Sequence, residues 1–153
     1  MSGVVPVDVV SEIEIGRPRS DVARYAADPG NATSWYENIK AVEWKTEPPL
    51  ALGSRVEFVA RFLGRRLAYT YQVIELVPGE RLVMRTAEGP FPMETTYTWG
   101  NRPDGGTRMT LRNRGEPSGF AKLAGPVIAQ AVRRANRADL RRLKSIVESA
   151  SAS

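Results

Sequence analysis

Apolar residues recur at helical spacing near the C-terminal end of the chain, between Gly119 and Ser149. At about 100° per residue, one side of the expected helix is apolar and the other is basic. The apolar positions are Ile128, Ala131, Val132, Ala135, Leu143 and Ile146. The basic positions are Arg133, Arg134, Arg137, Arg141 and Lys144. A single helix cannot bury such an apolar stripe against itself, so the rest of the chain must supply the surface that covers it.

Most of the remaining chain alternates apolar and polar residues with the period of two that is typical of β-strands. The expected strands are 4–15, 39–46, 55–63, 67–73, 81–88, 91–99 and 107–114. Short links rich in Gly and Pro, such as Gly64-Arg65, favour antiparallel neighbours. Between the first two strands, Ser20 or Asp21 is placed to cap a short helix, and residues 33–36 are expected to add one more turn.

This order of elements predicts an α+β fold in which a curved antiparallel sheet wraps around a long C-terminal helix. We expect about seven strands, with one or two short helices after the first strand. A chain of 153 residues can bury most of its surface as one domain, and we place that domain at 1–153. Residues 149–153 are expected to fray.

The composition is that of an ordinary globular protein, with 42% hydrophobic and 25% charged residues. No apolar run approaches the roughly 18 residues that cross a membrane, and the N-terminal residues lack the features of a secretory signal. We therefore expect a cytoplasmic protein. The chain has no Cys and no His, which removes disulfides, thiolate ligands and the usual general base. We expect neither a metal nor another cofactor.

The net charge of +5 raises the question of an anionic partner. Much of the excess is arginine on the outer side of the expected C-terminal helix. A solvated helix face is the simpler interpretation, and a surface for nucleic acid or anionic lipid is the alternative. Aromatic residues do not interleave with these arginines, so no specific nucleic acid is expected.

Several short segments punctuate the pattern in a characteristic order. They are 17–22 after the first strand, Asp28-Pro29 before Trp35, Gly53-Ser54 before an aromatic strand, 73–82 with a Pro-x-x-Arg-Leu turn, Gly106-Thr107 before the last strand, and 140–144 near the end of the helix. In this order the chain resembles the START-like superfamily, also called SRPBCC. It is most similar to the bacterial members of the polyketide cyclase/dehydrase type.

The resemblance implies a helix-grip fold with a largely apolar cavity between the sheet and the last helix. It also implies a lipid, polyketide, hormone or aromatic metabolite as the ligand. The superfamily includes binding proteins, transporters and enzymes without a shared catalytic motif, so the resemblance leaves the activity open.

Alternation places one set of side chains on the apolar face of the expected sheet. These candidates to line a cavity are Phe58, Phe62, Tyr69, Tyr71, Met84, Met93, Tyr97, Trp99, Met109 and Leu111. A solid core is the alternative for any one of them. Clustered tyrosines need hydrogen-bond partners when buried, and methionines adapt to irregular space, so together they favour a pocket with a few polar groups.

Polar residues on the same faces are sharper candidates for ligand contacts. Thr95 and Asn113 share the apolar face of the sheet, and Asn136 and Asp139 fall within the apolar side of the helix. A buried carboxylate is costly without a partner. Asp139 is therefore expected to pair with an arginine, face a wet cavity or lie at an unburied end, and the pairing is the favoured interpretation. Trp35 is either a lid over the sheet or a packing residue.

Three functions remain open from the sequence. The first is binding of a hydrophobic or aromatic small molecule, lipid- or polyketide-like, without chemistry. The second is an enzyme of the cyclase/aromatase type, in which positioning and Tyr or Asp groups assist the reaction. The third is a basic surface protein that engages nucleic acid or anionic lipid. Whether the protein is a monomer or a homodimer is left open.

Overall fold

The computed structural model describes residues 7–89, 92–115 and 125–150 of the chain. Its elements are β1 (Val7–Ile15), α1 (Arg19–Ala26), the 3-10 turn η1 (Pro29–Asn31), α2 (Ala32–Trp35), β2 (Ile39–Trp44), β3 (Arg55–Phe62), β4 (Arg65–Val77), β5 (Arg81–Glu88), β6 (Met93–Asn101), β7 (Thr107–Gly115) and α3 (Gly125–Ala150). This is the predicted order.

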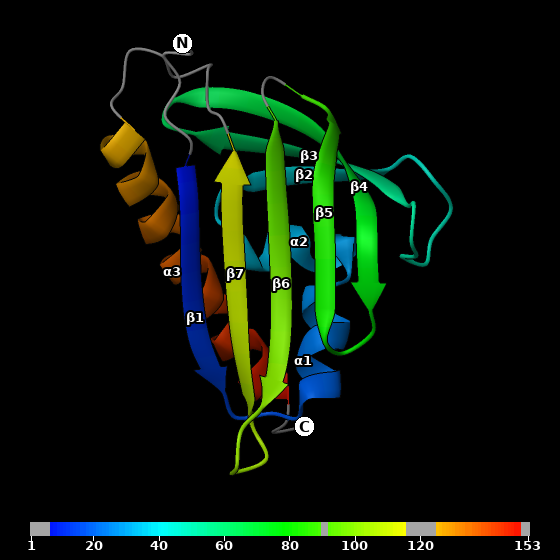
Figure 1. Ribbon diagram of the computed structural model, residues 1–153, viewed down its shortest axis with the longest axis vertical. Helices are drawn as coiled ribbons and strands as arrows, with labels where there is room; N and C mark the ends of the chain where they lie inside the picture. Colours follow the sequence, from blue (N-terminus) through cyan, green and yellow to red (C-terminus); the bar gives the residue numbers. More distant parts are fainter. Residues whose placement is uncertain (1–6, 90–91, 116–124, 151–153) are drawn as a thin grey trace.

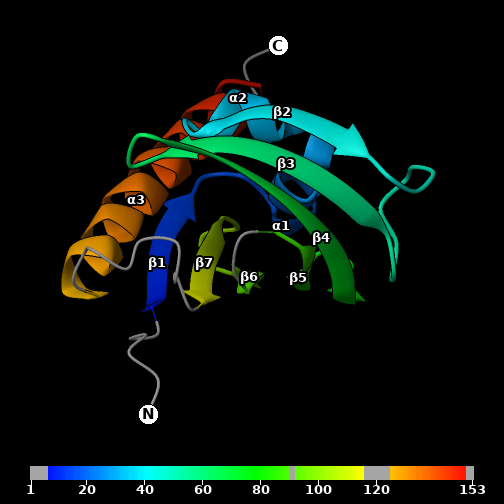
Figure 2. The same cartoon turned by 90° about the horizontal axis from the view of Figure 1, so that it is seen from above.

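The strands form one antiparallel sheet in the order β1-β7-β6-β5-β4-β3-β2. The sheet curls into a half-barrel, and α3 crosses its concave side with the short helices α1 and α2 beside it (Figures 1 and 2). The predicted α+β helix-grip fold is therefore confirmed. Register shifts in the β4–β5 and β2–β3 pairs mark irregularities that help a sheet to bend.

Several predicted boundaries change in the structure. Helix α1 begins at Arg19 after Pro18, so Ser20 and Asp21 lie inside its first turn and are not its N-cap. Asp28 caps the following η1 turn, because its Oδ1 accepts a hydrogen bond from the Gly30 amide at 2.9 Å. Helix α3 continues through Ala150, the second of the residues that were expected to fray. Residues 4–6, 91, 119–124 and 151–153 of the predicted elements lie outside the described residues.

The C-terminal half of α3 packs onto the sheet in a solid apolar core. Leu140, Leu143 and Val147 are buried in one cluster with Trp99 and Met109 from the neighbouring strands β6 and β7. Burying each large apolar side chain contributes roughly 1.5–3 kcal/mol. This core fixes the helix against the sheet and leaves its N-terminal half over the other end of the same strands.

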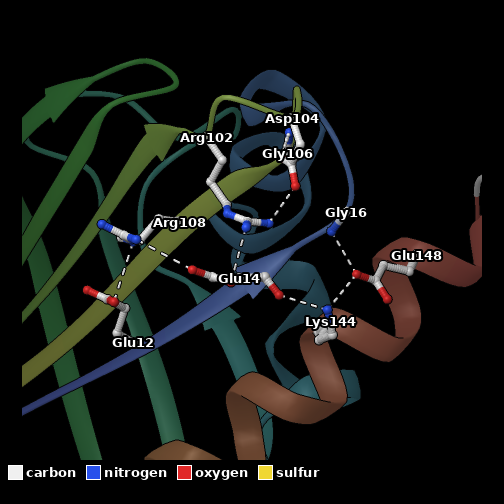
Figure 3. A network of polar contacts seen from close by, with 9 residues as sticks. All are labelled: Glu12, Glu14, Gly16, Arg102, Asp104, Gly106, Arg108, Lys144 and Glu148. Carbon is white, nitrogen blue, oxygen red and sulfur yellow. Dashed lines mark hydrogen bonds and ion pairs between the residues drawn. The ribbon is translucent and has the colours of Figure 1, made fainter.

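A network of polar contacts fastens this end of α3 to the end of β1 (Figure 3). Lys144 Nζ donates to the Glu14 carbonyl at 2.8 Å and to Glu148 Oε2 at 2.7 Å. Glu148 Oε2 also accepts a hydrogen bond from the Gly16 amide at 2.7 Å. The network therefore adds a charged clasp to the apolar contacts of the same helix.

The hairpin between β3 and β4 reaches toward the N-terminal half of α3 (Figure 2). Its turn consists of Leu63 and Gly64, one residue earlier than the Gly64-Arg65 turn expected from the sequence. Both turn residues have positive φ, 52° at Leu63 and 77° at Gly64. Positive φ at both positions matches the twist of the flanking strands, but it is unfavourable for a residue with a bulky side chain.

Candidate functional site

A cavity of about 180 Å³ lies between the N-terminal half of α3 and the concave face of the sheet. The predicted residues that line it are Phe58, Phe62, Tyr69, Tyr71, Met84, Met93, Thr95, Tyr97, Asn113, Asn136 and Asp139. They come from strands β3 to β7 and from α3, so the curvature of the sheet brings together side chains that are far apart in the sequence.

Four candidates from the sequence lie in the solid core instead of the cavity. Trp99, Met109 and Leu111 are buried beneath the C-terminal half of α3, although they share the concave face with the lining residues. Trp35 is fully buried in the same cluster. It is therefore a packing residue of the core and not a lid over the sheet. Alternation identifies the face of a strand, but it does not say how far along the strand the cavity extends.

The sequence interpretation missed lining residues from loops and strand ends. Tyr36, Asn38 and Ile39 follow α2 and close one side of the cavity, and no periodicity marks loop positions of this kind. The remaining lining residues are Val7, Ala60, Leu67, Ile128, Val132 and Ala135. The last three belong to the apolar stripe of α3, so that stripe was a usable signal for them.

A chain of hydrogen bonds connects the sheet to α3 across the cavity wall. Thr95 Oγ1 donates to Asn113 Oδ1 at 2.6 Å, and Asn113 Nδ2 donates to Asn136 Oδ1 at 3.1 Å. Burial raises the pKa of the nearby Tyr71 hydroxyl to about 12, although its contact with Thr95 opposes this rise. These groups fix the polar side chains of the cavity in one arrangement.

A second polar pair lies beside this chain. The hydroxyl groups of Tyr36 and Tyr97 form a hydrogen bond at 2.5 Å, and the ring of Trp35 packs 4.0 Å from the ring of Tyr36, centroid to centroid. Burial is the main cause that raises the pKa of both tyrosines well above the usual value. Both hydroxyls therefore stay protonated at neutral pH and can donate hydrogen bonds.

Asp139 is the one carboxyl group among the described residues of the cavity wall. It is only 2% exposed, and its Oδ1 accepts a hydrogen bond from the Glu37 amide at 3.0 Å. Burial raises its pKa from 3.8 to about 6, although the hydrogen bond and the field of Arg142 oppose this rise. The favoured prediction, that Asp139 pairs with an arginine, is wrong within the described part of the chain. Its partner is the backbone amide of Glu37, and its side chain lies in the cavity wall.

The arginines of the sheet and of α3 differ in their partners. Several arginines on the sheet form cross-strand ion pairs, as between Arg112 and Asp8 or between Arg114 and Glu94. The exposed arginines of α3 are Arg134, Arg137, Arg141 and Arg142, and none of them forms an ion pair with another described residue. Of the basic outer face expected for the helix, Arg134, Arg137 and Arg141 are exposed, whereas Arg133 is half-buried and Lys144 contacts Glu14 and Glu148. None of the described helices is long and apolar enough to cross a membrane.

Solved structures with the same fold span nearly the whole chain. A protein from Thermus thermophilus has 22% identity and a TM-score of 0.80, covering 94% of this chain and 99% of its own. A START superfamily protein from Mycobacterium smegmatis has 14% identity and a TM-score of 0.78, covering 93% and 97%. At such identities the likeness establishes the START-like fold and nothing more specific.

Some of the similar structures have a named activity. The Zhui aromatase/cyclase from Streptomyces sp. R1128 has 20% identity and a TM-score of 0.74, covering 94% of each chain. No curated protein matches the sequence. The family model for polyketide cyclase/dehydrase and lipid transport proteins matches residues 6–148. The chain therefore belongs to the polyketide cyclase/dehydrase and lipid transport family of the START-like superfamily.

Proposed function

We propose that this protein binds a hydrophobic or aromatic small molecule, lipid- or polyketide-like, in the cavity between the sheet and α3. The observation that carries the proposal is the cavity wall. Phe58, Phe62, Tyr69 and Leu67 surround the space with aromatic and aliphatic surface, and polar groups gather around Asn136 and Asp139. An apolar pocket with a few convergent polar groups is the usual form of a small-molecule site.

The lining can also adjust to the shape of its ligand, so the ligand need not fit a rigid cavity closely. Met84 and Met93 lie on the strands that face α3. Methionine side chains are flexible and polarisable, and they adjust to irregular shapes. Removing apolar surface from water contributes about 25 cal/mol for each Å² buried, so the ligand is held mainly by its apolar body.

Native mass spectrometry of protein purified from its own host tests this function, with extraction of whatever is bound. We expect a hydrophobic molecule that co-purifies at up to one copy per chain. A protein that carries nothing, and that also takes up no neutral fluorescent lipid or flavonoid-like probe, contradicts the proposal.

A cyclase or aromatase activity is the second candidate, and Asp139 is the observation that favours it. A carboxyl group with a pKa of about 6 can give or take a proton near neutral pH, and it lies in the cavity wall together with Tyr36 and Tyr97. In this proposal the cavity holds the substrate in a reactive shape and these groups assist enolisation and dehydration. If the protein is such an enzyme, Asp139→Asn removes turnover while ligand binding persists.

The basic outer face of α3 supports the third possibility, a partner of nucleic acid or anionic lipid. The presence of the cavity favours the small-molecule function over this one, since a basic face without a cavity is the pattern that would favour a surface function. We further propose one domain across 1–153, a cytoplasmic bacterial location and a monomer or homodimer. Size-exclusion chromatography with light scattering measures the last of these.

A further inference from the structure

One buried hydrogen-bond donor of the cavity wall is left without a partner. Asn136 is 4% exposed and lines the cavity, and its Oδ1 is occupied by the Asn113 amide. No group of the described residues accepts a hydrogen bond from its Nδ2. Leaving a buried donor unpaired is unfavourable, so this amide has the chemistry to bind an acceptor atom of a ligand.

The neighbouring bonds decide which end of the Asn136 amide is free. Thr95 donates to Asn113, and Asn113 in turn donates to Asn136. In both bonds the donor is on the side of the sheet and the acceptor is the next residue toward α3. The side-chain oxygen of Asn136 therefore accepts from the sheet, and its nitrogen has no hydrogen-bond partner among the residues that the structure describes. The chain therefore ends in a donor, and the complementary ligand group is an acceptor.

The charges of the cavity wall restrict that acceptor further. No Lys or Arg is among the described residues that line the cavity, whereas Asp139 is. Asn136 and Asp139 are three residues apart on one helix face, so their side chains are neighbours. A carboxylate bound at Asn136 would be buried beside an acidic group without a cation, which is costly. A neutral carbonyl oxygen meets no such cost.

The geometry points to a ligand that is uncharged, is anchored by a carbonyl-type oxygen on Asn136 Nδ2, and carries its remaining apolar body among the aromatic side chains. This inference rests on the small-molecule function proposed above. It selects neutral carbonyl compounds over fatty acids and other carboxylates, and it makes Asn136 a residue that determines specificity.

Three tricyclic probes of nearly the same shape test the inference on the intact protein by equilibrium dialysis. They are fluorenone with a carbonyl group, fluorene without one, and fluorene-9-carboxylate with a negative charge. We expect fluorenone to bind about tenfold more tightly than fluorene, the ratio given by one satisfied hydrogen bond to a buried donor. The carboxylate is expected to bind most weakly.

Two variants locate the effect. Asn136→Leu keeps a side chain of similar size, removes the donor, and is expected to abolish the preference for fluorenone. Val132→Ala, at an apolar lining position, is the matched control and should weaken fluorenone and fluorene by the same factor. In the wild type, the carbonyl stretch of bound fluorenone should also lie at lower frequency than in hydrocarbon solvent, a reading that needs no variant.

The outcomes separate this inference from the proposed function. Equal binding of fluorenone and fluorene by the wild type overturns the inference and leaves the small-molecule function standing, as does tightest binding of the carboxylate. An unshifted carbonyl stretch also overturns it. If none of the three probes binds, the inference falls, and the proposed function falls with it only if the protein also carries no co-purified molecule and takes up no neutral fluorescent lipid or flavonoid-like probe.

Discussion

Asp139 is the residue at which the loop after α2 and the middle of α3 meet. Its carboxyl group is buried, and the Glu37 amide holds it in place. Desolvation favours the neutral form of a carboxyl group, whereas the hydrogen bond from the amide favours the charged form. Burial is the larger effect here, which is why the pKa rises to about 6.

This raised pKa predicts a loss of stability as the pH rises. The unfolded carboxyl group loses its proton near 3.8, and the folded one near 6. Between these values the folded state binds more protons, so the free energy of unfolding falls with pH, by up to about 3 kcal/mol. Asp139→Asn keeps an oxygen for the Glu37 amide and removes this dependence.

Urea unfolding of both proteins at several pH values between 4 and 7 measures the effect. Taking the difference in unfolding free energy between wild type and Asp139→Asn cancels the contributions of the other titrating carboxyl groups. One of these is Glu94: burial alone would raise its pKa, but hydrogen bonds from Arg114 and Arg85 lower it. A difference that stays constant over this range would show that the carboxyl of Asp139 titrates normally.

Leu63 gives a second prediction at the scale of one residue. It has a φ of 52° in the β3–β4 turn, where the left-handed conformation costs roughly 1–2 kcal/mol for most residues. Asn tolerates this conformation, and Asn-Gly is the preferred sequence of such a turn. We expect Leu63→Asn to stabilise the protein by about 1 kcal/mol in urea unfolding, whereas Leu63→Val should destabilise it. An Asn variant no more stable than wild type would mean that the Leu63 side chain offsets the strain.

At the scale of elements, α3 has two halves with different tasks. Its C-terminal half is fixed by the apolar core around Leu140 and Leu143 and by the clasp of Lys144 and Glu148 (Figure 3). Its N-terminal half carries Asn136 over the cavity, and Asp139 lies where the two halves meet. The anchored half therefore sets the distance at which the other half stands from the sheet.

The clasp predicts a measurable cost when it is removed. Glu148→Ala takes away the acceptor for the Gly16 amide and for Lys144, both at 2.7 Å, and should destabilise the protein by about 1 kcal/mol. The control is Glu12→Ala, which removes only an exposed ion pair with Arg108 at 3.4 Å and should cost at most a few tenths of that. Equal effects of the two variants in urea unfolding would argue that the clasp contributes no more than a surface pair.

The alternation of strands and the stripe of α3 were sufficient to predict the architecture and most of the cavity wall. These patterns did not predict which residues along a strand line the cavity and which lie in the core. Tyr97 and Trp99 share one face of β6, yet a step of two residues, roughly 7 Å, takes the chain from the cavity into the core. Tyr36 and Asn38 were missed because loop residues carry no periodic signal.

At the scale of the whole molecule, α3 lies along the concave side of the curled sheet (Figure 2). Apolar packing closes one end of the space between them, and the cavity leaves the other end hollow. The closed end supplies the stability of the fold through buried apolar contacts. At the hollow end, aromatic side chains such as Phe58 and Tyr71 line the cavity. Ligand binding is the function that this unequal packing supports.

The most direct test of this account is the binding of a neutral fluorescent probe, N-phenyl-1-naphthylamine, to wild type and to a filled cavity. Val132→Trp places a large side chain in the cavity wall, and Ser145→Trp places the same side chain at an exposed position of α3. Circular dichroism confirms that each variant is folded. We predict one probe per chain for wild type and Ser145→Trp, and at least a tenfold loss of affinity for Val132→Trp. No binding by wild type, or equal affinity in all three proteins, would contradict a ligand site between the sheet and α3.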